Sequence, residues 1–154
     1  MKRILFLTGC ILIFVLTFYI YFSKHNTMEQ SKIIFTDKAP KPIGPYSQAV
    51  MRGNALFVSG QVAINPATGQ LDTSSIENET KQVMENIKAI VETAGMKMKD
   101  VVKSTIYLSD MNNFSKMNEV YGSYFPENPP ARETVQVSAL PKNMNVEISV
   151  IVIK

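Results

Sequence analysis

The stretch that decides the fold reads PPARETVQV and runs from Pro129 to Val137. Proline lacks the backbone N–H that a sheet needs, so the two prolines mark a loop that leads into a strand. Behind them valine alternates with threonine and glutamine, which is the period of a half-buried strand. Arg132 therefore lies where a stiff loop becomes a strand. Its guanidinium can bind a carboxylate through two parallel hydrogen bonds, although a plain surface ion pair is the alternative.

The hydrophobic pattern around this stretch predicts one α+β domain in the order β-ββ-α-β-α-β-β, with two helices on one face of a sheet. Strands are expected over residues 33–36, 49–51, 55–59, 101–108, 132–139 and 146–153. Helices are expected over residues 76–94 and from Asn112 to Phe125. The first helix ends at Gly95 and the second stops at Pro126, both of which are typical helix ends.

Charge is unevenly distributed along the 154 residues. The net charge of +3 comes from Lys2, Arg3 and Lys24, because the remaining basic residues balance the 13 acidic ones. A neutral domain lacks the basic surface of a general nucleic-acid-binding protein. The only histidine, His25, and the only cysteine, Cys10, both precede the domain. This excludes disulfides, Ser-His or Cys-His catalysis and a His or Cys metal site from it.

The N-terminal segment, residues 1–27, predicts a signal anchor. Residues 4–22 carry no charge and, at about 1.5 Å per residue, are long enough to cross most of a bilayer. A cleaved signal peptide is the alternative, and lipidation at Cys10 fits less well because the strongest hydrophobic run follows it. The basic residues ahead of this run place the domain, residues 28–154, outside the cytoplasm, with the cytoplasmic side as the alternative. A transmembrane helix or signal segment and a membrane-anchored or exported domain are therefore expected.

Glu147 is the second charged residue that the pattern singles out. It lies between Val146 and Ile148 in the strongly hydrophobic last strand, on the opposite face from both. A carboxylate at such a position is exposed, paired or used in chemistry, and a glutamate on an outer face is the plain alternative. If the last two strands form a hairpin, Glu147 faces Gln136 and lies roughly 13 Å along the sheet from Arg132. A direct ion pair between them within one chain is therefore not expected.

Six motifs in register resemble the Rid family, also known as YjgF, reactive intermediate deaminase and endoribonuclease L-PSP. They are IGPYSQA (43–49), FVSGQ (57–61), NPATG (65–69), NIKAIVE (86–92), VKST (102–105), and PAR with LPK (130–132 and 140–142). The resemblance covers about residues 34 to 153, which is nearly the whole domain. No single motif is decisive, but the six together are specific.

This resemblance implies a chorismate-mutase-like α+β domain with a mixed β-sheet and a homotrimer with clefts between subunits. It also implies cofactor-free hydrolysis of enamines and imines, such as 2-aminoacrylate, to 2-keto acids and ammonia. Arg132 matches the family arginine that holds the substrate carboxylate, and Glu147 matches the glutamate associated with the catalytic water. The positions that match the lining of the cleft are Tyr46, Ser59, Gly60, Asn118 and Thr134.

The sequence departs from the family pattern directly beside the arginine. Many members of the deaminase branch read PARSCV, whereas this chain has Glu133 and Thr134 after Arg132. Thr134 keeps a small polar side chain, so the cleft can survive without the thiol. Glu133 competes for the substrate carboxylate only if it shares a face with Arg132.

Three functions follow as hypotheses. The leading one is a 2-iminobutanoate/2-iminopropanoate deaminase-like hydrolase without cofactor or metal, in which Arg132 holds the substrate carboxylate and Glu147 positions water. The second is a non-catalytic protein that binds or senses small carboxylates at the membrane. The third is an endoribonuclease, which a neutral domain without histidine does not favour. The expected partners are a small imine or enamine, two further copies of the chain and a membrane reached through residues 4–22, but no nucleic acid.

Overall fold

The computed structural model describes residues 15–19 and 30–154. Residue contacts divide the chain into two units, Met1–Gln30 and Ser31–Lys154. Residues 15–19 are helical, and the second unit contains the sheet and the functional residues.

The prediction of a transmembrane helix over residues 4–22 is corrected by the structure. Crossing the hydrocarbon core takes about 20 consecutive apolar helical residues. Within residues 15–19 and 30–154, no helix is long and apolar enough to cross a bilayer. The rest of the predicted segment lies outside the described residues. The membrane-anchored or exported localisation depended on that helix and is corrected with it.

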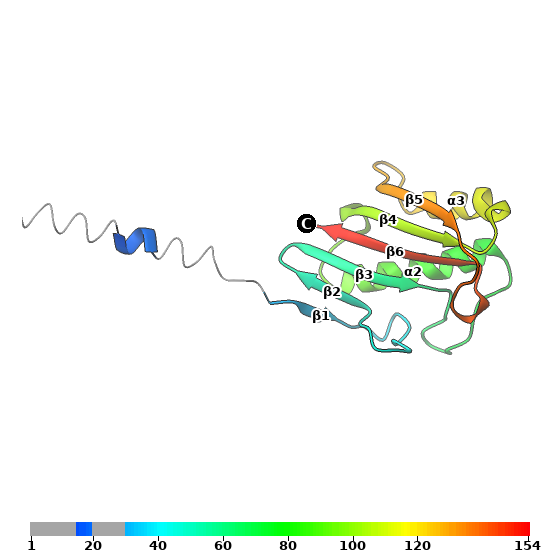
Figure 1. Ribbon diagram of the computed structural model, residues 1–154, viewed down its shortest axis with the longest axis horizontal. Helices are drawn as coiled ribbons and strands as arrows, with labels where there is room; N and C mark the ends of the chain where they lie inside the picture. Colours follow the sequence, from blue (N-terminus) through cyan, green and yellow to red (C-terminus); the bar gives the residue numbers. More distant parts are fainter. Residues whose placement is uncertain (1–14, 20–29) are drawn as a thin grey trace, which may run out of the picture. The chain divides into compact units, whose positions relative to one another are not determined.

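Six strands form one mixed sheet in the order β1-β2-β3-β6-β4-β5 (Figure 1). They are β1 (Lys32–Ile34), β2 (Ala49–Arg52), β3 (Ala55–Gln61), β4 (Val101–Leu108), β5 (Ala131–Gln136) and β6 (Val146–Ile153). Neighbouring strands are antiparallel except β4 and β5, which are parallel. The predicted order of elements is therefore the observed one.

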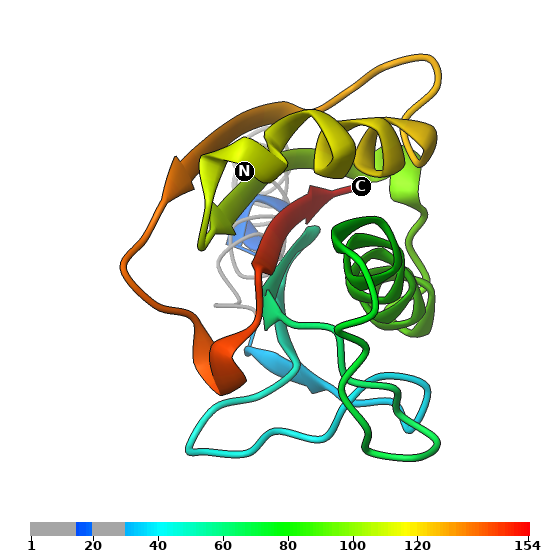
Figure 2. The ribbon, with the colours of Figure 1, turned by 90° about the vertical axis from the view of Figure 1, so that its right-hand side faces the viewer.

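Two helices, α2 (Ile76–Thr93) and α3 (Phe114–Ser123), cover the same face of the sheet (Figure 2). Ser75 caps the start of α2, because its side chain accepts a hydrogen bond from the Asn78 N–H, and the helix is followed by Gly95 at a φ of 76°. Three short 3-10 turns complete the domain: η1 (Met98–Asp100), η2 (Met111–Asn113) and η3 (Pro141–Asn143). The α+β class with two helices on one face of a mixed sheet is thus observed.

The predicted hairpin between the last two strands is wrong. Strand β6 lies between β3 and β4, and β5 forms the edge beyond β4. The physical reason is composition: β6 reads VEISVIVI, whereas β5 reads ARETVQ. A strand with that many apolar residues gains most by central burial, and a charged strand suits an edge. Glu147 accordingly pairs with Tyr107 on β4 instead of Gln136.

The two faces of the sheet differ in cover. Val146, Ile148, Val150 and Val152 of β6 are buried against the helices, as alternation requires. The opposite face carries the other side chains of each strand, and no helix of the second unit, Ser31–Lys154, covers it (Figure 2). Apolar side chains that stay exposed there include Ile33, Phe57, Val135 and Ile153. We call this second side the open face.

Candidate functional site

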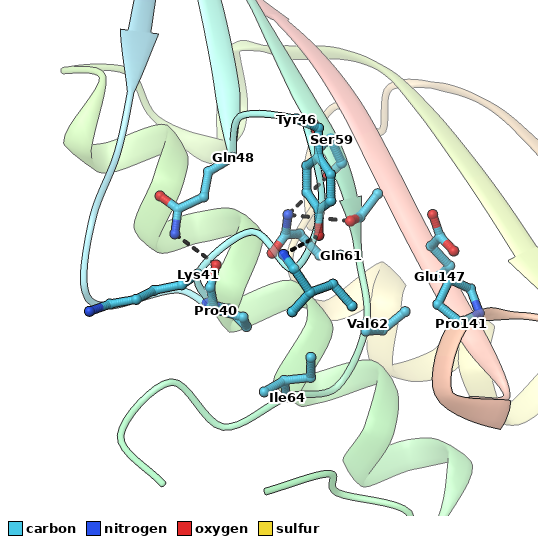
Figure 3. Close-up of a pocket in the computed structure, with 12 residues that line it drawn as sticks. Pro40, Lys41, Tyr46, Gln48, Ser59, Gln61, Val62, Ile64, Pro141 and Glu147 are labelled. Carbon is cyan, nitrogen blue, oxygen red and sulfur yellow. Dashed lines mark hydrogen bonds between the residues drawn. The ribbon is translucent and has the colours of Figure 1, made fainter. Parts of the chain in front are cut away.

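A pocket of about 300 Å³ opens beside β3 and β6, and we call it the glutamate pocket. Four of the predicted site residues, Tyr46, Ser59, Gly60 and Glu147, line it together. Tyr46 and Ser59 lie on one side, and Glu147 and Pro141 lie on the other (Figure 3). The remaining lining residues are Pro40, Lys41, Ile43, Gln48, Gln61, Val62 and Ile64.

Gln48 shapes the loop that forms one wall of this pocket. Its buried side-chain amide donates to the carbonyls of Thr36, Ala39 and Pro40, at 2.9, 3.1 and 2.8 Å. Its amide oxygen accepts the Thr36 N–H at 2.7 Å. One side chain thus satisfies four backbone groups that the proline-rich loop leaves without sheet partners. Sequence reasoning did not single out Gln48, although it stands inside the IGPYSQA motif.

Tyr46 and Ser59 are held by the same loop. The Tyr46 hydroxyl accepts the Ile43 N–H at 3.3 Å, and its ring lies 3.5 Å from the position of a Cβ on Gly44. The Ser59 hydroxyl donates to the Ser47 carbonyl at 2.7 Å, so its lone pairs remain open to a ligand. Both side chains therefore have fixed positions at the pocket wall.

Glu147 lies against the backbone of Gly60. A Cβ at Gly60 would come within 2.8 Å of Glu147 Cδ and would overlap the carboxylate, so glycine is needed for this close approach. Among residues 15–19 and 30–154, no side chain donates a hydrogen bond to the Glu147 carboxylate. Burial without a cation raises the pKa of Glu147 above that of an ordinary glutamate. The pocket thus holds a half-buried carboxylate that is suited to take up a proton.

Arg132 belongs to a second group, which we call the arginine cluster: Phe114, Asn118, Tyr121 and Arg132. The Arg132 Nη1 donates to Asn118 Oδ1 at 2.7 Å. Its guanidinium carbon lies 4.9 Å from the ring centroid of Tyr121 and 5.7 Å from that of Phe114. Aromatic faces and an amide oxygen orient the cation without neutralising it. The guanidinium keeps further N–H donors for a ligand anion.

The neighbours of Arg132 point to different faces. Glu133 is exposed on the open face, where Lys103 Nζ and Thr105 Oγ1 donate to it. These hydrogen bonds lower the pKa of Glu133, and the one from Lys103 has the largest effect. It therefore does not compete for the ligand of Arg132 in the same chain. Thr134 shares the face of Arg132, and its buried Oγ1 has no hydrogen-bond partner among the described residues.

The arginine cluster and the glutamate pocket do not meet within the chain. Arg132 pairs with Ser104 of β4, and Ser104 pairs with Val150 of β6, three residues beyond Glu147. Two strand spacings and three residues separate their Cα atoms by about 14 Å. Arg132 also reaches the helix-covered side, where it contacts α3, whereas Glu147 alternates with core residues and faces the open side. The predicted site residues therefore lie in two groups on opposite faces of the sheet.

Asn118 and Thr134 lie with Arg132 in this chain. The cleft that the resemblance implies for them and Tyr46 lies between subunits, so it stays a prediction. Sequence reasoning did not single out Glu79. It is fully buried and accepts hydrogen bonds from Asn145 and Val146. Only its position in the first turn of an amphipathic helix signals this role. Among the residues that the structure describes, no cluster of His, Cys, Asp or Glu could hold a metal ion.

Comparison with known proteins supports one family. The family model described as endoribonuclease L-PSP matches residues 36–154. A RutC family protein of Pyrococcus horikoshii is 56% identical over 123 residues, which cover 80% of this chain and 98% of that one. The human 2-iminobutanoate/2-iminopropanoate deaminase is 43% identical over 123 residues, which cover 80% of this chain and 90% of the relative.

Solved structures agree with this result. The crystal structure of E. coli TdcF with bound serine superposes with a TM-score of 0.77 at 40% identity, covering 80% of this chain and 98% of TdcF. The mixed sheet with two helices on one face is thus a shared architecture. The chain belongs to the Rid (YjgF) family, whose family model is described as endoribonuclease L-PSP.

Proposed function

We propose that this chain hydrolyses reactive imines and enamines of the 2-aminoacrylate type to 2-keto acids and ammonia. The site forms between two copies of the chain in a homotrimer, where Arg132 of the partner subunit faces the glutamate pocket. The observation that carries this proposal is the division of the site. A braced cation and an unpaired carboxylate lie on opposite faces of one sheet, so no single ligand can bridge them within one chain.

The open face supports the assembly. Phe57 and Ile153 expose 48% and 43% of their surfaces there. Phe57 pairs with Val50 on β2 and with Ile151 on β6. An apolar sheet face of this kind gains stability when another copy covers it. Glu147 lies on that face, so a neighbouring subunit can bring its edge strand β5 and Arg132 toward the pocket. A homotrimer is also what the resemblance to the family implies.

Arg132 binds the substrate through its carboxylate. Its planar guanidinium offers a fork of N–H donors that matches a carboxylate bidentately, and the aromatic rings already fix its orientation. The orphaned Thr134 hydroxyl, two residues along the same face, supplies a further polar group for the ligand. Little conformational entropy is lost on binding because the cation is held before the ligand arrives.

Glu147 carries out the proton transfers. An enamine such as 2-aminoacrylate first tautomerises to its imine. Water then adds to the carbon of the protonated imine, and one proton of the water passes to Glu147. The product of this addition is a carbinolamine. Glu147 returns that proton to the carbinolamine nitrogen. The C–N bond then breaks, and the hydroxyl oxygen becomes the carbonyl oxygen of the 2-keto acid. The hydroxyl proton leaves with ammonia as ammonium. Base assistance of this kind contributes about 10²–10⁴-fold.

The names of relatives divide between two activities. The family model is described as an endoribonuclease, whereas mite, mouse and human relatives are named 2-iminobutanoate/2-iminopropanoate deaminases. A net-neutral domain without histidine favours the deaminase, because RNA cleavage needs affinity for phosphates and a proton-transfer pair. TdcF, crystallised with bound serine, shows that one relative binds a small amino acid with a carboxylate.

The proposal is tested by keto-acid release from imines that an amino-acid oxidase generates in the assay. The full chain is expected to accelerate release, and both Arg132→Ala and Glu147→Gln are expected to lose it. Binding of 2-oxobutanoate by calorimetry without any acceleration would instead assign a non-catalytic carboxylate-binding protein. Cleavage of RNA that disappears in Arg132→Ala would assign the ribonuclease.

A further inference from the structure

Glu79 is a buried carboxylate that the proposed mechanism leaves without a task. It lies in the first turn of α2 and has none of its surface exposed, and it is the only charged residue buried in the part of the chain that the structure describes. Isolated buried charges are costly unless hydrogen bonds satisfy them. Its partners therefore show what it holds in place.

All three hydrogen bonds to the Glu79 carboxylate are donated by Asn145 and Val146, the two residues that precede Glu147. Glu79 Oε1 accepts the backbone N–H groups of Asn145 at 2.5 Å and Val146 at 3.2 Å. Glu79 Oε2 accepts the side-chain amide of Asn145 at 2.9 Å. Hydrogen bonds to a charged acceptor are the strong kind, so the first residues of β6 are tied firmly to α2.

The chain needs such a tie because the loop before β6 is unusual. Lys142 and Asn143 have φ values of 60° and 56°, a left-handed conformation that costs energy for residues other than glycine. The far side of Asn145 is held by Ser109 after β4, whose N–H donates to the Asn145 carbonyl at 3.1 Å. Asn145 is thus clamped between helix α2 and the end of β4, two residues before Glu147.

We propose that Glu79 is a positioning residue for the reaction, because it fixes the point and direction at which β6 starts and so aims Glu147 into the glutamate pocket. This inference rests on the role proposed for Glu147. A shift of one residue in the start of β6 would turn every side chain of that strand to the other face. A smaller shift would move the Glu147 carboxylate away from Gly60, where the backbone leaves it little room.

A purely structural role for Glu79 makes different predictions, and the same helix provides a comparison. Asn86, two turns farther along α2, is equally buried and donates to the carbonyls of Val62 and Ile64 at 3.2 and 3.1 Å. These two residues form the apolar wall of the pocket. Loss of the Asn86 side chain is therefore expected to weaken substrate binding and to raise KM. Val83→Ala, in the core of the same helix, lowers stability without touching either wall.

The variant Glu79→Gln tests the proposal with a minimal change in shape. Its amide oxygen can still accept the two backbone N–H groups, but its amide nitrogen then faces the Asn145 amide, which is also a donor. The double variant Glu79→Gln with Asn145→Asp restores a donor opposite an acceptor at that contact. The carboxylate at position 145 also still accepts the hydrogen bond that the Ser109 hydroxyl makes there.

The expected result is a kcat lower by about 10-fold or more in Glu79→Gln, with KM within about twofold of the unchanged chain. The double variant is expected to recover most of that loss, and Val83→Ala is expected to keep kcat despite its lower stability. The proposal is overturned if Glu79→Gln keeps the full kcat. It is equally overturned if the double variant does not recover kcat while it folds and assembles normally.

Amide hydrogen exchange on the same variants keeps this inference separate from the proposed function. Exchange at residues 144–148 is expected to accelerate in Glu79→Gln, to return in the double variant and to stay unchanged in Val83→Ala. If the unchanged chain hydrolyses no imine yet exchange follows this pattern, the positioning contact holds and the proposed function fails. Unaltered exchange in Glu79→Gln would overturn the inference whatever the activity.

Discussion

The glutamate pocket and the arginine cluster are opposite in how they hold their charge. Glu147 lies in a shaped pocket with no cation beside it, and burial raises its pKa. Arg132 lies at an edge strand without a carboxylate, braced by two rings and the Asn118 oxygen. Both side chains are partly buried, but the carboxylate has no hydrogen-bond donor among the described residues, whereas the guanidinium is held in a fixed orientation.

This difference indicates the kind of ligand that would satisfy both. Neither charge has an ion-pair partner among residues 15–19 and 30–154, so a ligand with one negative and one positive end complements the pair. A protonated imine with a carboxylate on the adjacent carbon has that distribution: the carboxylate suits Arg132, and the iminium with its water suits Glu147. The two halves are expected to remain weak binding sites until a second copy brings them together.

Removing the guanidinium is expected to have the largest effect. Arg132→Ala should lower kcat/KM by about 10³-fold or more, because the substrate loses its bidentate anchor, and Arg132→Lys should restore little of it. Steady-state kinetics on the oxidase-coupled assay measures both. Lys81→Ala, which removes an exposed cation of α2 on the helix-covered side of the sheet, is the control and should stay near full activity. A fully active Arg132→Ala would remove the arginine half from the account.

Replacing the carboxylate of Glu147 is expected to separate activity from stability. Glu147→Gln should lower kcat by about 10²–10⁴-fold, because no base accepts the proton of water. The raised pKa means that the folded state binds this proton more tightly than the unfolded state does. The stability that it contributes is present at low pH and is lost as pH rises through the raised pKa.

Glu147→Gln should therefore be slightly more stable than the unchanged chain at pH 7, by at most about 1 kcal/mol because the group is partly solvated, and equally stable near pH 4. Urea denaturation at the two pH values checks this. In the unchanged chain, activity should fall on the acid side at a pH above the 4.5 of an ordinary glutamate. An acid limb at or below that value would show that burial does not set the working pKa.

Filling the space above Gly60 tests the close approach that the pocket requires. Gly60→Ala should lower kcat by about 10- to 100-fold, because a Cβ there displaces the Glu147 carboxylate. Gly122→Ala on α3 is the control, since a Cβ there meets nothing and should raise stability by about 0.5–1 kcal/mol. If Gly60→Ala keeps full activity, as the control Gly122→Ala should, then Glu147 does not act from its present position.

The smallest effect is expected from Glu133→Ser, which replaces the carboxylate with a small hydroxyl side chain. Glu133 faces away from Arg132 and pairs with Lys103 and Thr105 on an exposed surface. Kinetic constants should therefore change less than about twofold. A gain of tenfold or more in kcat/KM would mean that Glu133 reaches the arginine of another subunit.

Local structure followed from the sequence more closely than pairing did. Alternation and β-branched residues predicted the bounds of β4 and β6 at Val101–Leu108 and Val146–Ile153, as observed. The position of β6 inside the sheet was not predicted, because backbone hydrogen bonds do not reveal in the sequence which strands pair. Strands that are neighbours in the sequence were assumed to pair. That one assumption misplaced Glu147 relative to its neighbours.

The candidate site shows the same limit. Arg132 and Glu147 could be singled out because each is a charge in an apolar or rigid setting. Gln48 and Glu79 could not, since their importance depends on which backbone groups the fold brings to them: those of the nearby proline-rich loop for Gln48, and those of a segment 66 residues away for Glu79. A hydrophobic run over residues 4–22 likewise resembled a membrane span, although no helix of the described residues meets that requirement.

We propose that Arg132 and Glu147 act together across two subunits, and mixing of variant subunits tests this arrangement. Arg132→Ala and Glu147→Gln chains, each inactive alone, are co-refolded in equal amounts, and mixed trimers are verified by native mass spectrometry. Random mixing leaves both residues intact at about one quarter of the intersubunit sites, so about one quarter of full activity should return. If mixed trimers form but remain as inactive as the parent variants, the site does not span two subunits and the account is wrong.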